Sequence, residues 1–262
     1  MSEPLITYEL DGNIALIGLN RPDKRNAIND PLIDELRAAV LRAHEEADVA
    51  VLFGHGSNFC AGLDLAEALA RATGQIKAPR KRRRHNWHEV FDLIARGPIP
   101  FVAALHGAVV GGGLELATAA HVRVGDASLV CGLPEGQRGI FVGGGGTVRI
   151  QRVVGTSVMM DMMLTGRLLN AEESEREHIV RYVVPAGEAF NKAKEIAARV
   201  AKNSLETNWM IINVLPRIHD MSHDDGLFVE QLNSGRARPP EAEARLREFV
   251  DGKAKKLQEN QA

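Results

Sequence analysis

The chain of 262 residues is long enough to bury a large hydrophobic core, and its 45% hydrophobic and 25% charged residues are ordinary for a globular protein. With 32 basic and 34 acidic residues the formal net charge is -2, which argues against a protein built mainly to bind nucleic acid. Two cysteines are too few for a disulfide framework and match no zinc spacing. The N-terminal residues lack a secretory signal, and no stretch approaches the roughly 18 apolar residues of a membrane span, so we expect a cytoplasmic protein.

Strand and helix signals alternate along the first part of the chain. The first strands should form a hairpin that turns at Asp11 and Gly12, and Pro31 suits the first turn of the helix that follows. The predicted elements are a hairpin, a helix and two buried strands, over residues 5–20, 31–47, 49–56 and 100–107. Because strands alternate with helices, we expect an α/β fold with crossover connections.

The last third of the chain carries helical signals alone. Helical periodicity covers 187–203 and 204–215, and a charged final helix should begin at Pro239 and Pro240. We therefore divide the chain into an α/β core over 1–190 and a helical region over 191–262, which we expect to pack on the core and on neighbouring subunits.

Two glycine turns and a later acidic turn carry the features most suited to chemistry. The stretch VVGGGLELATAA places Glu115 two residues past three glycines, at the head of a short helix. The stretch SNFCAGLDL repeats this arrangement, with a small-residue turn and a helix predicted from Asp64. Glu135 follows a proline 20 residues after Glu115. Since helix starts offer unpaired amides, two such turns and two carboxylates could meet a single substrate.

Other motifs fail on inspection. No glycine cluster has the lysine of a P-loop or the G-x-G-x-x-G spacing, and neither G-x-S-x-G nor H-E-x-x-H occurs. His85 and His88 lack a third metal ligand nearby, so we expect no metal site. A basic run, Arg80 to Arg84, is most often a solvated surface, with phosphate binding a minority outcome.

Taken in order, five stretches resemble the crotonase, or enoyl-CoA hydratase/isomerase, superfamily over nearly the whole chain. They are NRPDKRNAIN, NFCAGLDL, HGAVVGGGLELATAAHVRVG, LPEGQRGIFVGGGGTVRI and LTGRLLNAEESEREHIV. The resemblance implies a spiral of ββα units with a helical C-terminal region, usually assembled into homotrimers or dimers of trimers. It also implies an acyl-CoA thioester as the substrate, so coenzyme A would arrive with the substrate and no cofactor would be bound permanently.

The resemblance also assigns site residues. The oxyanion-hole amides of the family fall on Leu63 and Gly112, where they would hold the thioester oxygen as it gains negative charge. The two carboxylates of the hydratases fall on Glu115, which would activate water, and Glu135, which would deliver a proton. Coenzyme A would lie along the NRPDKRNA segment and the AGLDL turn, with one of two cations near its phosphates. The residues implied for this contact are Lys24, Arg25, Ala27, Ala61, Asp64 and Leu65.

Three functions remain open at this point. The retained glutamate pair favours hydration, whereas double-bond isomerisation, thioester hydrolysis or retro-aldol cleavage can proceed with one carboxylate. A nucleic-acid-binding relative of the family would use the basic run, against which the near-neutral composition argues. Two positions depart from the family pattern: Val142 stands where a proline is frequent, close to the expected acyl pocket, and His178 stands where a glycine is usual.

Overall fold

The computed structural model describes residues 3–76, 86–235, 243, 246–247 and 249–251. The basic run at 80–84, His85 and the helix start expected at 239–240 lie outside these residues. The chain forms two compact units, over 1–201 and 202–262. The helix that we assigned to the C-terminal region, α7 (Ala189–Val200), therefore falls within the first unit. In the described part of the chain, none of the helices is both long and apolar enough to cross a bilayer.

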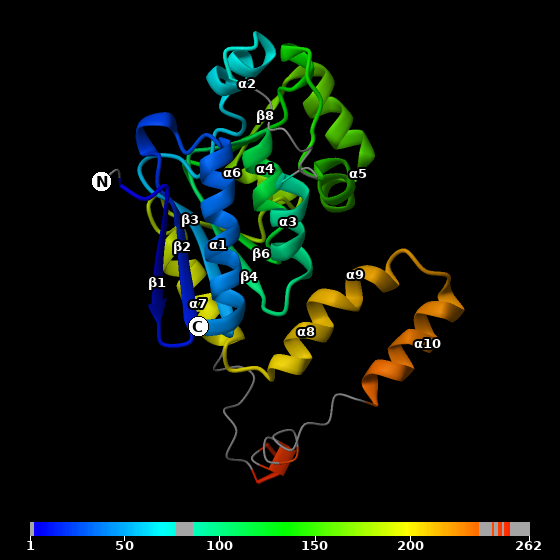
Figure 1. Ribbon diagram of the computed structural model, residues 1–262. Coiled ribbons are helices and arrows are strands. Elements are labelled where there is room, and N and C mark those ends of the chain that lie inside the picture. The colour runs from blue at the N-terminus through cyan, green and yellow to red at the C-terminus, as the bar shows by residue number, and fades with distance from the viewer. Residues whose placement is uncertain (1–2, 77–85, 236–242, 244–245, 248, 252–262) are drawn as a thin grey trace. The chain divides into compact units, whose positions relative to one another are not determined.

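A six-stranded sheet forms the centre of the first unit (Figure 1). In spatial order its strands are β1 (Ile6–Asp11), β2 (Ile14–Leu19), β3 (Val49–Gly54), β4 (Phe101–Leu105), β6 (Val122–Asp126) and β9 (Tyr182–Val184). The predicted hairpin is confirmed as the antiparallel pair β1 and β2, and every later pairing in this sheet is parallel. Parallel neighbours require crossover connections, which confirms the predicted α/β class.

A smaller sheet of three strands stands beside the first. It contains β5 (Ala108–Val110), β7 (Val130–Gly132) and β8 (Leu168–Asn170), with β5 and β7 parallel and β7 and β8 antiparallel. Successive strands thus alternate between the two sheets: β4 belongs to the large sheet, β5 to the small one, β6 to the large one and β7 to the small one. The site described below lies where β5 leads into the next helix.

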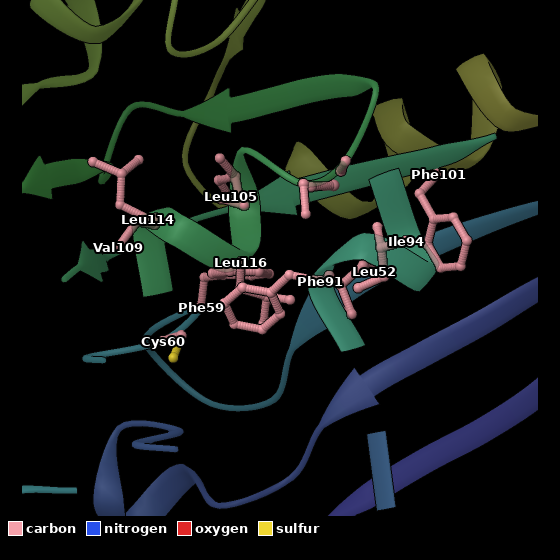
Figure 2. Packing of buried hydrophobic residues seen from close by; sticks show 14 of the residues in the cluster. Leu52, Phe59, Cys60, Phe91, Ile94, Phe101, Leu105, Val109, Leu114 and Leu116 are labelled. Atoms are coloured by element: carbon pink, nitrogen blue, oxygen red, sulfur yellow. The ribbon is translucent and has the colours of Figure 1, made fainter. Parts of the chain in front are cut away.

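Helices cover both faces of the large sheet. Residues of β2 alternate between two buried clusters, so that Ala15 and Ile17 face one side and Ile14 and Leu16 face the other. The larger cluster includes side chains from α1 (Asp30–Glu46) and α3 (Asn86–Arg96), and the smaller one includes side chains from α7 (Figure 1). Figure 2 shows part of the larger cluster, where side chains of α3, β3 and β4 pack together.

Four shorter or later helices complete the first unit. They are α2 (Leu65–Ala72), α4 (Gly112–Ala117), α5 (Gly146–Thr165) and α6 (Ala171–Arg176). The helix predicted from Asp64 is α2, and Asp64 caps it by accepting hydrogen bonds from the amides of Ala66 and Glu67. The helix predicted after the three glycines is α4.

The second unit is helical in its described part. It contains α8 (Leu205–Asn213), α9 (Leu215–Ile218) and α10 (His223–Ser234). Ser204 and Ser222 cap α8 and α10 by accepting a hydrogen bond from a backbone amide of the first turn.

Candidate active site

The two glycine turns and the NRPDKRNA segment lie around one cavity of about 210 Å³. Nine of the ten residues that the sequence analysis assigned to a site line this cavity: Lys24, Arg25, Ala27, Ala61, Leu63, Asp64, Leu65, Gly112 and Glu135. The tenth, Glu115, does not line it but lies buried in α4 next to the same turn. The structure therefore brings together residues from four separate segments of the chain.

Backbone pairing holds the first two segments side by side. The amide of Ile28 donates to the carbonyl of Gly62 at 2.7 Å, and the amide of Asp64 donates back to the carbonyl of Ile28 at 2.9 Å. The loop before Ile28 is fixed by Asn26, which is fully buried and donates to two backbone carbonyls at 2.9 and 2.7 Å. This pairing brings Lys24 and Arg25 into the lining of the cavity.

The backbone amides of Leu63 and Gly112, which line the cavity, have no acceptor among the described residues. Gly62, directly before Leu63, has a φ of +86°, and a Cβ there would lie 2.5 Å from the carbonyl oxygen of Val110. Gly111, directly before Gly112, has a φ of +56°. The amides of Leu63 and Gly112 therefore each follow a glycine with a positive φ. This backbone conformation turns the amide away from regular backbone pairing.

Glu115 is held by the backbone at the start of α5. Its Oε1 accepts a hydrogen bond from the amide of Gly144 at 2.7 Å and another from the amide of Gly146 at 2.8 Å. The side chain is 2% exposed. Two amides at the start of α5 thus fix the position of the Glu115 carboxylate.

Glu135 has a different environment from Glu115. It is buried, and its Oε2 has no hydrogen-bond partner among the described residues. A Cβ at Gly111 would lie 2.7 Å from its Oε1, so the carboxyl group reaches the glycine turn. Burial raises the pKa of Glu135, and the negative charge of nearby Glu115 raises that pKa further.

Known proteins resemble this chain over most of its length. The sequence model of the family described as Enoyl-CoA hydratase/isomerase matches residues 9–231. A protein of Arabidopsis thaliana named "Probable enoyl-CoA hydratase 2, mitochondrial" is 35% identical over 85% of this chain and 73% of its own length. A Dictyostelium discoideum protein named "Probable enoyl-CoA hydratase, mitochondrial" is 34% identical over 86% of this chain and 80% of its own length.

Solved structures give the same result. A crystal structure of a candidate enoyl-CoA hydratase from Rhodopseudomonas palustris has a TM-score of 0.86, 41% sequence identity and 97% coverage of both chains. The enoyl-CoA hydratase of Bacillus anthracis has a TM-score of 0.85 and 26% identity, with 95% of this chain and 96% of that chain covered. The chain belongs to the enoyl-CoA hydratase/isomerase family. It is an enzyme with the crotonase fold, as the motif order predicted.

The structure of this hydratase/isomerase family member adds cavity residues that the sequence analysis did not single out. They are Val110, Gly111, Arg138 and Ile140. Arg138 lies in the 3₁₀ turn Gly136–Arg138. Its position three residues after Glu135 was the one sequence feature that could have indicated a place near the site. Among the described residues, no group of three or more His, Cys, Asp or Glu side chains could hold a metal ion.

Proposed function

We propose that this enzyme adds water across the 2,3 double bond of an enoyl-CoA thioester. One observation carries the proposal: the amides of Leu63 and Gly112 and one carboxyl oxygen of Glu135 have no partner among the described residues and belong to residues that line a single cavity, with a second carboxylate fixed beside it. Both the family membership and the retention of two glutamates support hydration.

The amides of Leu63 and Gly112 would hold the thioester oxygen. As water attacks C3, negative charge moves through C2 to this oxygen, and donors that already point at it need no reorganisation. Loss of one such donor typically lowers the rate about 10²-fold or more.

The two glutamates would divide the proton transfers. Glu115, held in place by the amides of Gly144 and Gly146, would accept a proton from the water whose oxygen bonds to C3. Glu135, whose pKa is raised by burial, would donate a proton to C2. The enzyme returns to its starting charge when the proton on Glu115 passes back to Glu135 through the next water.

Coenzyme A would enter and leave as part of the substrate. Lys24 and Arg25 line the cavity and supply positive charge for its phosphates. The remaining contacts would come from Ala27, Ala61, Asp64 and Leu65 along the pantetheine. Arg21 fixes Asp64 with an ion pair at 3.1 Å, so that the AGLDL turn is preorganised for this contact.

The test uses Glu115→Gln and Glu135→Gln. Each amide keeps the shape of the side chain but cannot exchange protons, so kcat for crotonoyl-CoA should fall by about 10²-fold or more while thioester binding persists. The double variant should be scarcely slower than the slower single variant, because residues that act as a unit are not additive.

Isotopes separate hydration from the related reactions. A hydratase incorporates ¹⁸O from labelled water at C3 and deuterium at C2. Deuterium exchange at C2 without oxygen incorporation, together with one nearly silent glutamate variant, would instead identify an isomerase.

A further inference from the structure

A second cavity of about 180 Å³ adjoins the first and shares Leu63 and Asp64 with it. One part of its lining is apolar and comes from Ile28, Leu63, Ala68 and Trp87. The cations and small residues that would contact coenzyme A line only the first cavity. An acyl group attached to a thioester at Leu63 therefore has the second cavity as an adjoining space.

Aromatic side chains of α3 connect this second cavity to the glycine turns. Trp87 lies directly against Gly112, where a Cβ would collide with its ring. The rings of Trp87 and Phe91 lie 5.8 Å apart. Phe91 in turn reaches Gly144, whose amide holds Glu115. One continuous aromatic wall thus runs from the second cavity past an oxyanion amide to the catalytic carboxylate.

The other part of the lining is polar and carries excess negative charge. Arg71 pairs with Asp30 and with Glu67, each at 2.6 Å, so one guanidinium faces two carboxylates. Asn29 lies next to Asp30 in the same lining. Carboxylate oxygens accept hydrogen bonds and repel further anions. This end of the cavity therefore suits a hydrogen-bond donor rather than an acidic group.

We propose that the second cavity receives the part of the acyl group beyond C3, and that the preferred substrate carries there a ring-sized group with a hydroxyl at its far end. The proposal rests on the proposed function for the placement of the thioester. The volume fits, since an apolar cavity of about 150 Å³ holds a benzene ring. The ring would lie against Trp87, and the hydroxyl would donate to Asp30 or Glu67.

Binding of saturated thioesters, which cannot be hydrated, tests this without relying on turnover. By calorimetry, 3-phenylpropanoyl-CoA should bind more tightly than butanoyl-CoA. The 3-(4-hydroxyphenyl)propanoyl thioester should bind about tenfold more tightly again, the value of a hydrogen bond to a charged acceptor. The 4-carboxyphenyl analogue should bind more weakly than the phenyl compound. Equal dissociation constants across the set, or tightest binding of the carboxylate, would overturn the proposal.

A cavity-filling variant locates the effect. Ala68→Leu should weaken both phenyl-containing thioesters by about tenfold and change butanoyl-CoA by less than about twofold. Ala72→Leu makes the same change on an exposed position of the same helix outside both cavities and should alter none of the three. If Ala68→Leu and Ala72→Leu behave alike, the acyl group does not enter the second cavity.

Charge variants test the far end of the cavity. Asp30→Asn and Glu67→Gln should reduce the roughly tenfold difference in affinity between the 4-hydroxyphenyl and the phenyl thioester, and at least one of them should reduce it to about twofold. The dissociation constants of the phenyl and butanoyl thioesters should not change. An unchanged preference in both variants rejects the hydroxyl contact. Hydration of crotonoyl-CoA tests the proposed reaction independently of the second cavity. Normal hydration together with equal binding of all acyl groups would contradict the role of the second cavity but not the proposed reaction. Selective binding without hydration removes the proposed reaction instead.

Discussion

The two glutamates show how environment separates residues of the same type. Glu115 accepts two backbone hydrogen bonds at a helix N-terminus, whereas Glu135 is buried with one oxygen unpartnered among the described residues. The first environment holds the carboxylate in place through two donors, and the second penalises a negative charge. Acid–base catalysis on one substrate requires a proton acceptor that is fixed in place and a second group that retains its proton more readily.

The raised pKa of Glu135 predicts a pH-dependent cost in stability. The carboxyl group of Glu135 binds its proton more tightly in the folded protein than in the unfolded chain. The contribution of this group to the free energy of unfolding is therefore fully present below the usual carboxyl pKa. That contribution is lost as pH rises through the raised value. Glu135→Gln should therefore exceed the wild type in free energy of unfolding at neutral pH and match it near pH 4.

Urea unfolding at about pH 4, 5.5 and 7 measures this difference. Glu9→Gln, at an exposed position of β1, is the matched control and should show no such trend. A Glu135→Gln difference that stays constant with pH would contradict the assignment of a buried, penalised charge.

His178 is the second residue whose conformation decides its effect. Its φ is +63°, in the left-handed region that glycine adopts without cost, and its side chain is exposed. This explains in physical terms why the family usually has glycine here. His178→Gly should raise the free energy of unfolding by about 0.5–1 kcal/mol, as measured by urea unfolding. His178→Ala keeps the Cβ and should give no such gain; equal effects of the two substitutions would show that the backbone is not the cause.

At the scale of elements, the site depends on one helix start receiving a side chain from another helix. The amide of Gly146 opens α5 and binds Glu115 of α4, and a Cβ at Gly146 would lie 2.8 Å from the Oε1 and Cγ atoms of Glu115. Position 146 therefore requires glycine, because the side chain of Glu115 leaves no room for a Cβ. Because α4 also begins with the amide of Gly112, which has no acceptor among the described residues, two short stretches of backbone would together set the geometry of the proposed oxyanion donor and of the proposed base.

Gly146→Ala tests this dependence. The added methyl group should displace the Glu115 carboxylate and lower kcat at least about tenfold, with little change in KM, since small misplacements of a catalytic group are costly. Gly143→Ala is the matched control in the same glycine run, where a Cβ would meet nothing within 4 Å. Its turnover should stay near that of the wild type. A normal kcat in Gly146→Ala would show that Glu115 tolerates another position.

At the scale of the whole molecule, large apolar side chains remain on the surface. Trp209 is 44% exposed, Phe228 61% and Leu164 of α5 81%. Others in α8, α9 and α10 are Leu205, Ile211, Leu215, Leu227 and Leu232. Large apolar side chains exposed on successive helices, as on α8, α9 and α10, are typical of an interaction site.

We expect this surface to be covered by further copies of the chain. Sedimentation equilibrium of the full chain should give a mass three or six times that of one chain. Phe228→Glu and Trp209→Lys should shift the mass toward the monomer, because a charge buried in an interface without a partner is costly. An active monomer that is stable at micromolar concentration would refute the expectation.

The α/β class, the N-terminal hairpin with the helix and strand after it, and the two glycine turns could be predicted from the sequence. These depend on local periodicity and on where glycine must stand. The sequence also identified nine of the residues that line the first cavity, because their order along the chain matches a family pattern.

The partners that these residues contact depend on how the elements pack together. Glu115 and Gly146 are 31 positions apart in sequence, and Trp87 meets Gly112 because α3 packs against the glycine turn. The pairing of Arg71 with Asp30 likewise joins α2 to α1. Hydrogen bonding, burial and cavity volume depend on contacts between elements distant in sequence, so they distinguish the two glutamates and create the second cavity only once the sheet and its helices have packed.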